Sequence, residues 1–204
     1  MSTNPLPDAL RVLAEVARAF DTLGIAYLVG GSVASSTHGD FRATQDVDMV
    51  AELQNAHVNA LVQELGADYY ADPDMMRGAI AARSCFNLIQ IPLGIKVDVF
   101  IADGSPFARE EMRRRLRLPV FGADTEPVCI ASAEDIALQK LRWYRMTGER
   151  SDRQWNDVQG VLRVQANALD IAYMGQWAGE IGVADLLTRA LDDAGLADIL
   201  PTLP

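Results

Sequence analysis

Three acidic residues in the first half of the chain have the setting of metal ligands. Asp46 and Asp48 stand two residues apart in an alternating stretch that predicts a strand, so both carboxylates project from one face. Like charges held together are costly unless protons or a cation offset them. Asp98 is the single acid of a second predicted strand, and a carboxylate buried in such a strand usually has a partner. If Asp98 lies on a paired strand with its side chain on the same face, three acids surround one site.

Mg²⁺ is the cation that this set of residues predicts, because it prefers oxygen ligands and readily bridges carboxylates and phosphates. Two such ions about 3.5–4 Å apart stabilise both the attacking and the leaving oxygen of an in-line displacement. Nitrogen and sulfur ligands are not expected, since the chain has two histidines and two cysteines, none at metal-ligand spacing. We expect Cys85 and Cys129 to be buried free thiols.

A glycine turn precedes the acids. Gly30, Gly31 and Ser32 follow a short apolar run that predicts a buried strand. Glycines let the backbone come close to a triphosphate without a Cβ in the way. Backbone N–H groups at the start of the following helix then point at phosphate oxygens, and the Ser32 hydroxyl adds one more donor. The turn therefore predicts a phosphate cradle that faces the metal-binding acids.

Each of these features also has a purely structural explanation. A Gly-Gly-Ser turn is most often only a turn, and an Asp-x-Asp strand is often a solvated face of a sheet. The conjunction of the turn, the acid pair and the later acid, in this order and spacing, is far more specific than any one member.

Hydrophobic periodicity predicts the elements that position these residues. In the first half it predicts helices over 8–23, 32–37 and 55–65, strands over 25–29, 45–51, 84–91 and 95–101, a hairpin turn at 92–94, and short edge strands at 119–121 and 128–130. From Ser132 the pattern is helical: a first helix to about Met146, capped by Ser132 with Asp135 three residues later, a second capped by Ser151, and two more between 168 and 200. The chain is therefore expected to have an α+β fold, with a first domain over 1–130 and a helical domain over 131–204 that completes the active-site cleft.

The motifs resemble those of the DNA polymerase β-like nucleotidyltransferase superfamily. Its pattern is a Gly-Gly/Ser turn, a nearby Asp-x-Asp/Glu pair and a later acidic strand residue, here Gly31-Ser32, Asp46/Asp48 and Asp98. More narrowly, the segments LVGGSVA (28–34) and RATQDVDM (42–49) look like those of AbiEii-type bacterial nucleotidyltransferases, many of which are toxins of toxin–antitoxin pairs. The resemblance implies a mixed sheet flanked by helices, Mg²⁺ dependence and transfer of a nucleotide from a nucleoside triphosphate.

The resemblance extends to the helical half. It implies that Lys140 contacts nucleotide phosphate and that Asp157 positions Lys140 or the acceptor; the alternative is a surface ion pair between two helices. Arg42 and Thr44 would bond near the triphosphate, or else shape the turn before the strand. One departure is Asn156, where these relatives usually have a lysine.

Composition limits the partners. The formal charge of −10 lowers the expectation that the protein binds long nucleic acid through phosphates. A run of arginines could still grip a tRNA, although such a run is more often a solvated face: Arg113, Arg114, Arg115 and Arg117. No apolar run is long enough to span a membrane, and a cytoplasmic protein is expected.

Two classes of function remain open from the sequence. The first is an enzyme that transfers a nucleoside monophosphate to a hydroxyl of tRNA, of a protein or of a small compound such as an aminoglycoside, with an antitoxin as a further partner if it is a toxin. The second is an inactive nucleotidyltransferase-like module that binds a protein or senses a nucleotide. All three acids are present, which favours the enzyme.

Overall fold

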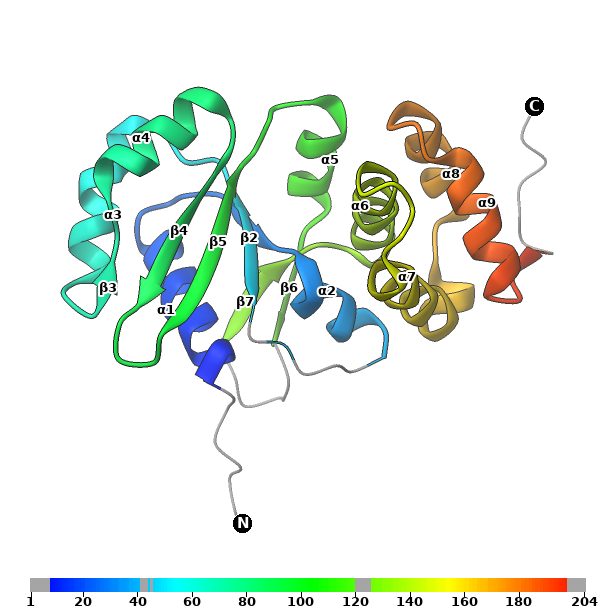
Figure 1. The fold of residues 1–204 in the computed structure, drawn as a ribbon, viewed down its shortest axis with the longest axis horizontal. Coiled ribbons are helices and arrows are strands. Elements are labelled where there is room, and N and C mark those ends of the chain that lie inside the picture. The colour runs from blue at the N-terminus through cyan, green and yellow to red at the C-terminus, as the bar shows by residue number, and fades with distance from the viewer. Residues whose placement is uncertain (1–7, 41–43, 45, 120–125, 198–204) are drawn as a thin grey trace, which may run out of the picture. The chain divides into compact units, whose positions relative to one another are not determined.

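The computed structural model describes residues 8–40, 44, 46–119 and 126–197 (Figure 1). Contacts divide the chain into two units: a sheet unit, Met1–Gly30 with Ala43–Ile130, and a helical unit, Gly31–Arg42 with Ala131–Pro204. The segment 31–42 therefore belongs to the helical unit, although it lies within the range expected for the first domain. The expected α+β fold with helices at its C-terminal end is confirmed.

A mixed sheet forms the centre of the sheet unit. Among the described residues its order is β3-β4-β5-β2-β1-β7-β6, with β2–β5 and β1–β7 parallel and the other neighbours antiparallel. The strands are β1 (Tyr27–Val29), β2 (Val47–Ala51), β3 (Tyr69–Tyr70), β4 (Cys85–Gln90), β5 (Ile95–Ile101), β6 (Leu116–Pro119) and β7 (Pro127–Ile130). The predicted hairpin of β4 and β5 is confirmed.

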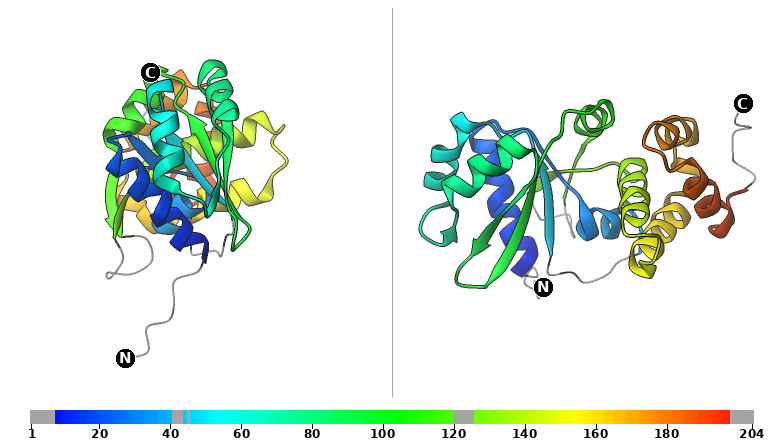
Figure 2. Two further views of the ribbon diagram at one scale, coloured as in Figure 1. Left: turned by 90° about the vertical axis from the view of Figure 1, so that its left-hand side faces the viewer. Right: turned by 45° about the horizontal axis from the view of Figure 1, so that its top comes forward.

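Helices cover one face of this sheet. The helices of the unit are α1 (Asp8–Thr22), the 3-10 turn η1 (Asn55–His57), α3 (Val58–Leu65), α4 (Pro73–Ala82) and α5 (Pro106–Arg114). Helices α1, α3 and α4 pack together beside β4 and β5 (Figure 2). Leu13, Val16 and Phe20 recur at helical spacing on α1 and are buried, which confirms the amphipathic first helix.

Two predicted strand boundaries and one predicted strand position were wrong. Strand β2 begins at Val47, so Asp46 precedes it, and Gln45 lies outside the described residues. Strand β6 ends at Pro119 rather than beginning there. Strand β7 is not an edge strand, because it lies between β1 and β6 in the sheet. Short strands are placed by their partners, which local sequence does not reveal.

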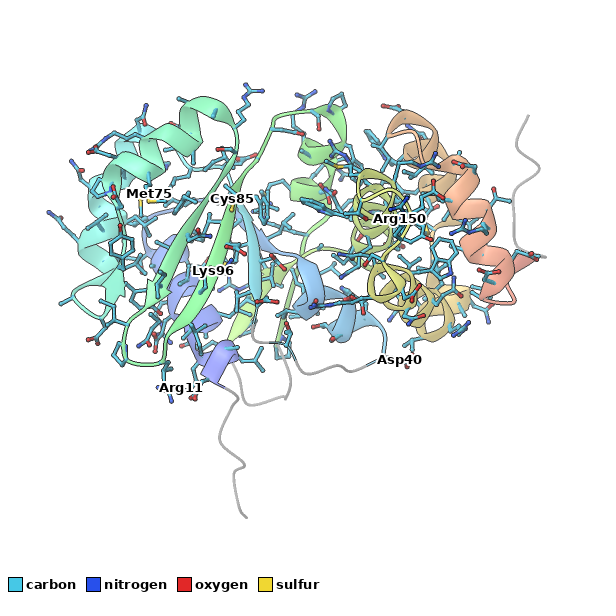
Figure 3. All side chains as sticks on the ribbon, in the orientation of Figure 1. Arg11, Asp40, Met75, Cys85, Lys96 and Arg150 are labelled. Atoms are coloured by element: carbon cyan, nitrogen blue, oxygen red, sulfur yellow. The ribbon has the colours of Figure 1, made fainter. Side chains whose placement is uncertain are left out.

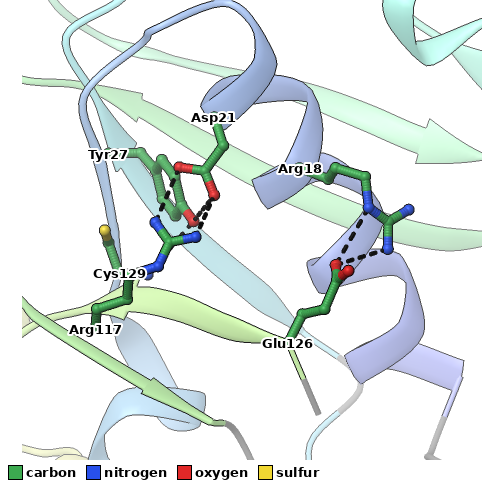
Figure 4. Close-up of polar contacts among 6 residues, drawn as sticks. All are labelled: Arg18, Asp21, Tyr27, Arg117, Glu126 and Cys129. Carbon is green, nitrogen blue, oxygen red and sulfur yellow. Dashed lines mark hydrogen bonds and ion pairs between the residues drawn. The ribbon is translucent and has the colours of Figure 1, made fainter.

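A polar cluster ties the β6–β7 hairpin to α1 (Figure 4). Arg117 on β6 binds Asp21 on α1, with a shortest nitrogen–oxygen distance of 3.1 Å. The buried Tyr27 hydroxyl accepts a hydrogen bond from the backbone N–H of Cys129 and donates one to Asp21, at 3.4 and 3.5 Å. Burial raises the pKa of Tyr27 to about 12, so the phenol stays protonated and remains a donor.

Two arginines of the run form ion pairs within the same unit. Arg113, in the last turn of α5, pairs with Glu110 one turn earlier, and Arg117 pairs with Asp21. A second link between α1 and the hairpin, Arg18 to Glu126, is also drawn in Figure 4. These pairings favour the structural interpretation of the run over a grip on a polyanion.

The helical unit is built from α2 (Gly31–His38), α6 (Ala133–Met146), α7 (Asp152–Gln165), the 3-10 turn η2 (Ala166–Ala168), α8 (Ile171–Glu180) and α9 (Ala184–Asp193). The predicted caps are confirmed: Ser132 accepts from the N–H of Asp135, and Ser151 accepts from that of Gln154. Within the described part of the chain, no helix is both long and apolar enough to cross a bilayer.

Helices α2 and α7 approach closely where two glycines meet. A Cβ built on Gly39 would lie 2.6 Å from the backbone nitrogen of Val161 and 2.7 Å from the carbonyl carbon of Gly160. Backbone atoms cannot swing aside as a flexible side chain can. The contact therefore requires glycine at position 39.

Gly39→Ala is expected to lower the free energy of unfolding of the helical unit by about 1–3 kcal/mol, because it overpacks this contact. Urea unfolding followed by tryptophan fluorescence reports on this unit, since Trp143, Trp155 and Trp177 all lie in it. Gly179→Ala is the matched control, because a Cβ there meets nothing within 4 Å. Equal midpoints for the two variants would show that α2 and α7 do not pack this closely.

Candidate active site

A row of residues crosses three strands of the sheet at one level and ends just after a fourth, β1. Asn87 on β4 pairs in register with Asp98 on β5, and Asp98 pairs with Asp48 on β2. The row ends at Gly30, whose backbone N–H donates to the carbonyl oxygen of Asp48 at 2.9 Å. Register partners project to the same face of a sheet, so the structure brings the side chains of Asp48 and Asp98 together.

The core fixes this register. Val47 and Met49 on β2 and Val97 and Val99 on β5 have no solvent exposure, whereas the acids between them are partly exposed. A slip of one residue would turn these apolar side chains out of the core, which makes the register costly to change. The apolar face that packs against helices thus holds the acids on the accessible face.

Asp98 has two partners on its own face. Its Oδ2 lies 2.7 Å from Nζ of Lys96, two residues earlier on β5, and its Oδ1 accepts from Nδ2 of Asn87. The hydrogen bond to Asp98 raises the pKa of Lys96 above its ordinary value. Sequence reasoning expected a partner for Asp98 but named neither residue. The spacing of Lys96 and Asp98, two apart on a strand, was the signal for the first.

Asp46 lies just before β2 and is exposed. Its backbone N–H donates to the hydroxyl of Thr44 at 3.2 Å. This bond is consistent with the interpretation that Thr44 shapes the turn before the strand. Arg42, the other residue assigned to this turn, lies outside the described residues.

The acids suit a hard cation. Carboxylate oxygens are the ligands that Mg²⁺ prefers, and Asp48 and Asp98 lie side by side in register. In the described ranges, no three His, Cys, Asp or Glu side chains form a group able to hold a metal ion. The arrangement therefore offers two neighbouring carboxylates, of which Asp98 is bonded to Lys96 and Asn87.

Cys85 lies on the same face as Asn87, two residues before it on β4; Figure 3 labels Cys85 and Lys96 on neighbouring strands. It is exposed, so the expectation that both cysteines are buried was wrong; Cys129 is intermediate. Partial burial of the thiol and the nearby Asp98 raise the pKa of Cys85 to about 11, which keeps it protonated and weakly nucleophilic at neutral pH.

In the helical unit, the glycine turn leads into α2. Gly31, the first residue of α2, has φ +53°, a left-handed conformation that glycine adopts without strain, and the next residue, Ser32, is buried. The guanidinium of Arg153 on α7 donates to the Ser32 hydroxyl at 3.1 Å. A guanidinium beside a helix N-terminus is suited to bind an anion. Arg153 was not among the predicted site residues, because only the fold places it there.

Lys140 on α6 and Asp157 on α7 form an ion pair with Nζ 2.6 Å from Oδ2. Their side chains are 6% and 11% exposed, so the interpretation as a surface pair was wrong. A buried pair carries a desolvation cost that exposed pairs avoid. The structure thus brings together the two residues that the sequence resemblance selected in the helical half.

The sequence matches no protein-family model and no curated protein. Its fold, however, is shared with solved structures. An antigenic nucleotidyltransferase-like protein from Paracoccidioides brasiliensis is 18% identical, with a TM-score of 0.57 over 96% of this chain and 95% of that one. The antibiotic-resistance factor ANT(2'')-Ia is 14% identical in its solution structure, with a TM-score of 0.54 over 92% and 97%. Its crystal structure in complex with adenylyl-2''-tobramycin is 13% identical, with a TM-score of 0.53 over 90% and 98%. The chain therefore has the nucleotidyltransferase fold.

Proposed function

We propose that this protein is a metal-dependent nucleotidyltransferase that transfers a nucleoside monophosphate from a nucleoside triphosphate to an acceptor hydroxyl. The observation that carries the proposal is the register of Asp48 with Asp98 on the accessible face of a nucleotidyltransferase sheet. Gly30, which follows β1, lies beside Asp48 in the same row. Mg²⁺ and the triphosphate are the proposed cofactor and substrate.

In the proposed reaction the acids bind the cation, and Asp98 also takes the proton of the acceptor. The acceptor oxygen attacks the α-phosphorus, the bond from that phosphorus to the β-bridging oxygen breaks, and pyrophosphate leaves with the electron pair. Asp98 accepts the hydroxyl proton. Asp48 and Asp98 would hold Mg²⁺, and Asp46, exposed just before β2, is proposed as a further ligand. When bound, Mg²⁺ stabilises the negative charge that develops on the phosphate oxygens.

For phosphate binding we propose two candidates within the helical unit. The N–H of Gly30 donates to the carbonyl oxygen of Asp48, so it is not a candidate donor to phosphate. Ser32 at the start of α2 and Arg153 beside it supply a hydroxyl and a guanidinium. Lys140 is proposed to contribute a further cation, held in place by Asp157.

The space beside Gly30, next to Asp48 on the accessible face of the sheet, is open. A Cβ on Gly30 would meet nothing within 4 Å and, by register, would project on the face that carries the acids. Gly30→Ala is therefore expected to fold normally but to raise KM for the triphosphate about tenfold, the equivalent of about 1.4 kcal/mol. Gly78→Ala, on α4 and equally open, is the control. An unchanged KM would mean that the substrate does not approach Gly30.

A cationic, hydroxylated small molecule is the acceptor class that we infer first. The chain carries a net charge of −10, which attracts cations. A structural neighbour was solved with adenylyl-2''-tobramycin, a nucleotidylated aminoglycoside. Arg113 and Arg117 are ion-paired internally, which gives little support to a tRNA acceptor. A protein acceptor, a toxin role with its antitoxin, and the AbiEii-type likeness stay predictions.

Pyrophosphate release tests the function directly. Each of the four nucleoside triphosphates is supplied with Mg²⁺ and, in turn, aminoglycosides, bulk tRNA and the protein itself as acceptors. Asp46→Ala/Asp48→Ala is the blank. Release that disappears in the blank supports nucleotidyl transfer, and the labelled product identifies the acceptor. Equal signals from the two proteins would contradict the proposal.

The second candidate function is a nucleotide sensor without turnover. The contact between Lys96 and Asp98 favours it, because a lysine that never leaves Asp98 would exclude a metal from that acid. A sensor would bind the triphosphate, measured by calorimetry, and release no pyrophosphate with any acceptor.

A further inference from the structure

Lys96 and Asn87 together engage both carboxylate oxygens of Asp98. Nζ of Lys96 lies 2.7 Å from Oδ2, and the Asn87 amide donates to Oδ1. Both donors come from strand positions on the same face: Lys96 two residues before Asp98, and Asn87 opposite it on β4. The Asp98 carboxylate is thus oriented from two sides by its own sheet.

The two donors differ in how easily they leave. Lys96 is 49% exposed and carries its charge on a flexible four-carbon stem, so the ammonium can move into solvent. Asn87 is shorter, neutral and partly buried, and its position is fixed by the β4–β5 register. A cation that approaches Asp98 therefore meets one movable charge and one fixed dipole.

Electrostatics gives the two donors opposite effects on a divalent cation. The ammonium offsets the charge of the acids, and so it competes with any cation for Asp98. The amide carries no net charge, and it holds the oxygens in one orientation. Removal of the ammonium should strengthen cation binding, whereas removal of the amide should weaken it by freeing the carboxylate to rotate.

We propose that Lys96 is the resident counter-ion of Asp98, which a divalent cation must displace, and that Asn87 is the positioning residue that keeps Asp98 in place when Lys96 leaves. The inference rests on the proposed function, since it assumes that Asp48 and Asp98 bind the cation. Under this proposal, Lys96 sets the concentration of divalent cation that the enzyme needs in order to be active.

Mn²⁺ binding without nucleotide tests this proposal and needs no turnover. Mn²⁺ prefers the same oxygen ligands and can be titrated by electron paramagnetic resonance. Lys96→Met is expected to bind Mn²⁺ about tenfold more tightly, the scale of the repulsion between a unit charge and a divalent ion a few ångströms apart in water. Asn87→Ala is expected to bind it more weakly than wild type.

Arg11→Met is the matched control, because it removes one positive charge from the same unit at α1, where Arg11 pairs with Asp8. Equal tightening in Arg11→Met and Lys96→Met would reduce the effect to net charge and overturn the proposal. Weaker or unchanged binding in Lys96→Met would also overturn it. Thermal unfolding of each variant confirms that the protein is folded.

Asp48→Asn separates failure of this inference from failure of the proposed function. If wild type binds Mn²⁺ and Asp48→Asn does not, the carboxylate site exists, whatever the Lys96 variant does. If wild type binds no Mn²⁺, or Asp48→Asn binds it equally well, the proposed function loses its metal site and this inference fails with it.

Discussion

Asp48→Asn is expected to lower kcat/KM for nucleotidyl transfer by about 10³-fold, because it removes a charged oxygen from the proposed cation site at the centre of the row. The amide keeps the shape of the side chain, so β2 and its register should survive. Folding should not be weakened, since the substitution also removes one of two neighbouring negative charges. Pyrophosphate release gives the rate, and thermal unfolding gives the stability.

Glu52→Gln is the control for this result. Glu52 follows the last residue of β2 and is exposed, so the same carboxylate-to-amide change occurs next to the same strand but away from the row. Its activity should match wild type. A loss of activity shared by both variants would point to the net charge of the protein, and an active Asp48→Asn would remove Asp48 from the mechanism.

The local sequence pattern was sufficient to predict the helices and strands that bury one face. Helix α1, the β4–β5 hairpin and the capped helices α6 and α7 were all predicted, because each combines apolar periodicity with a turn or a capping residue. In each of these elements the spacing of apolar residues already shows which face is buried.

Two helices lay outside the prediction. Helices α4 and α5 each begin with a capping residue followed by proline: Asp72-Pro73 and Ser105-Pro106. These pairs start helices, but they also start turns. Each helix is short and buries few residues, so the apolar stripe that would have decided between the two was weak.

In the candidate site, too, some features could be predicted from the sequence and others could not. The types and spacing of Asp48 and Asp98 were visible in the sequence, but their register was not, since strand pairing depends on contacts far along the chain. The Asn87 partner of Asp98 and the contact of Arg153 with Ser32 join residues 11 and 121 positions apart. Such contacts form only in the tertiary structure, so the local pattern of a single sequence does not predict them.

Lys140→Met is expected to lower the free energy of unfolding of the helical unit by about 3–5 kcal/mol, because it leaves the Asp157 carboxylate buried without its counter-ion. Asp157→Leu should have a similar effect through Lys140. Tryptophan fluorescence during urea unfolding measures both, since Trp143 and Trp155 lie on the same two helices. Arg145→Met on α6 is the control; it breaks an ion pair with Asp185 that is far more exposed, and it should cost much less.

The double variant Lys140→Met/Asp157→Leu decides what the pair is for. Replacing a buried ion pair by apolar side chains of similar size is often neutral or stabilising, so the double variant should recover most of the lost stability. If it is stable but releases no pyrophosphate, the charges serve the reaction and not the fold. If it is stable and active, Lys140 has no role with phosphate. If Lys140→Met alone costs no more than Arg145→Met, the pair is not buried in solution.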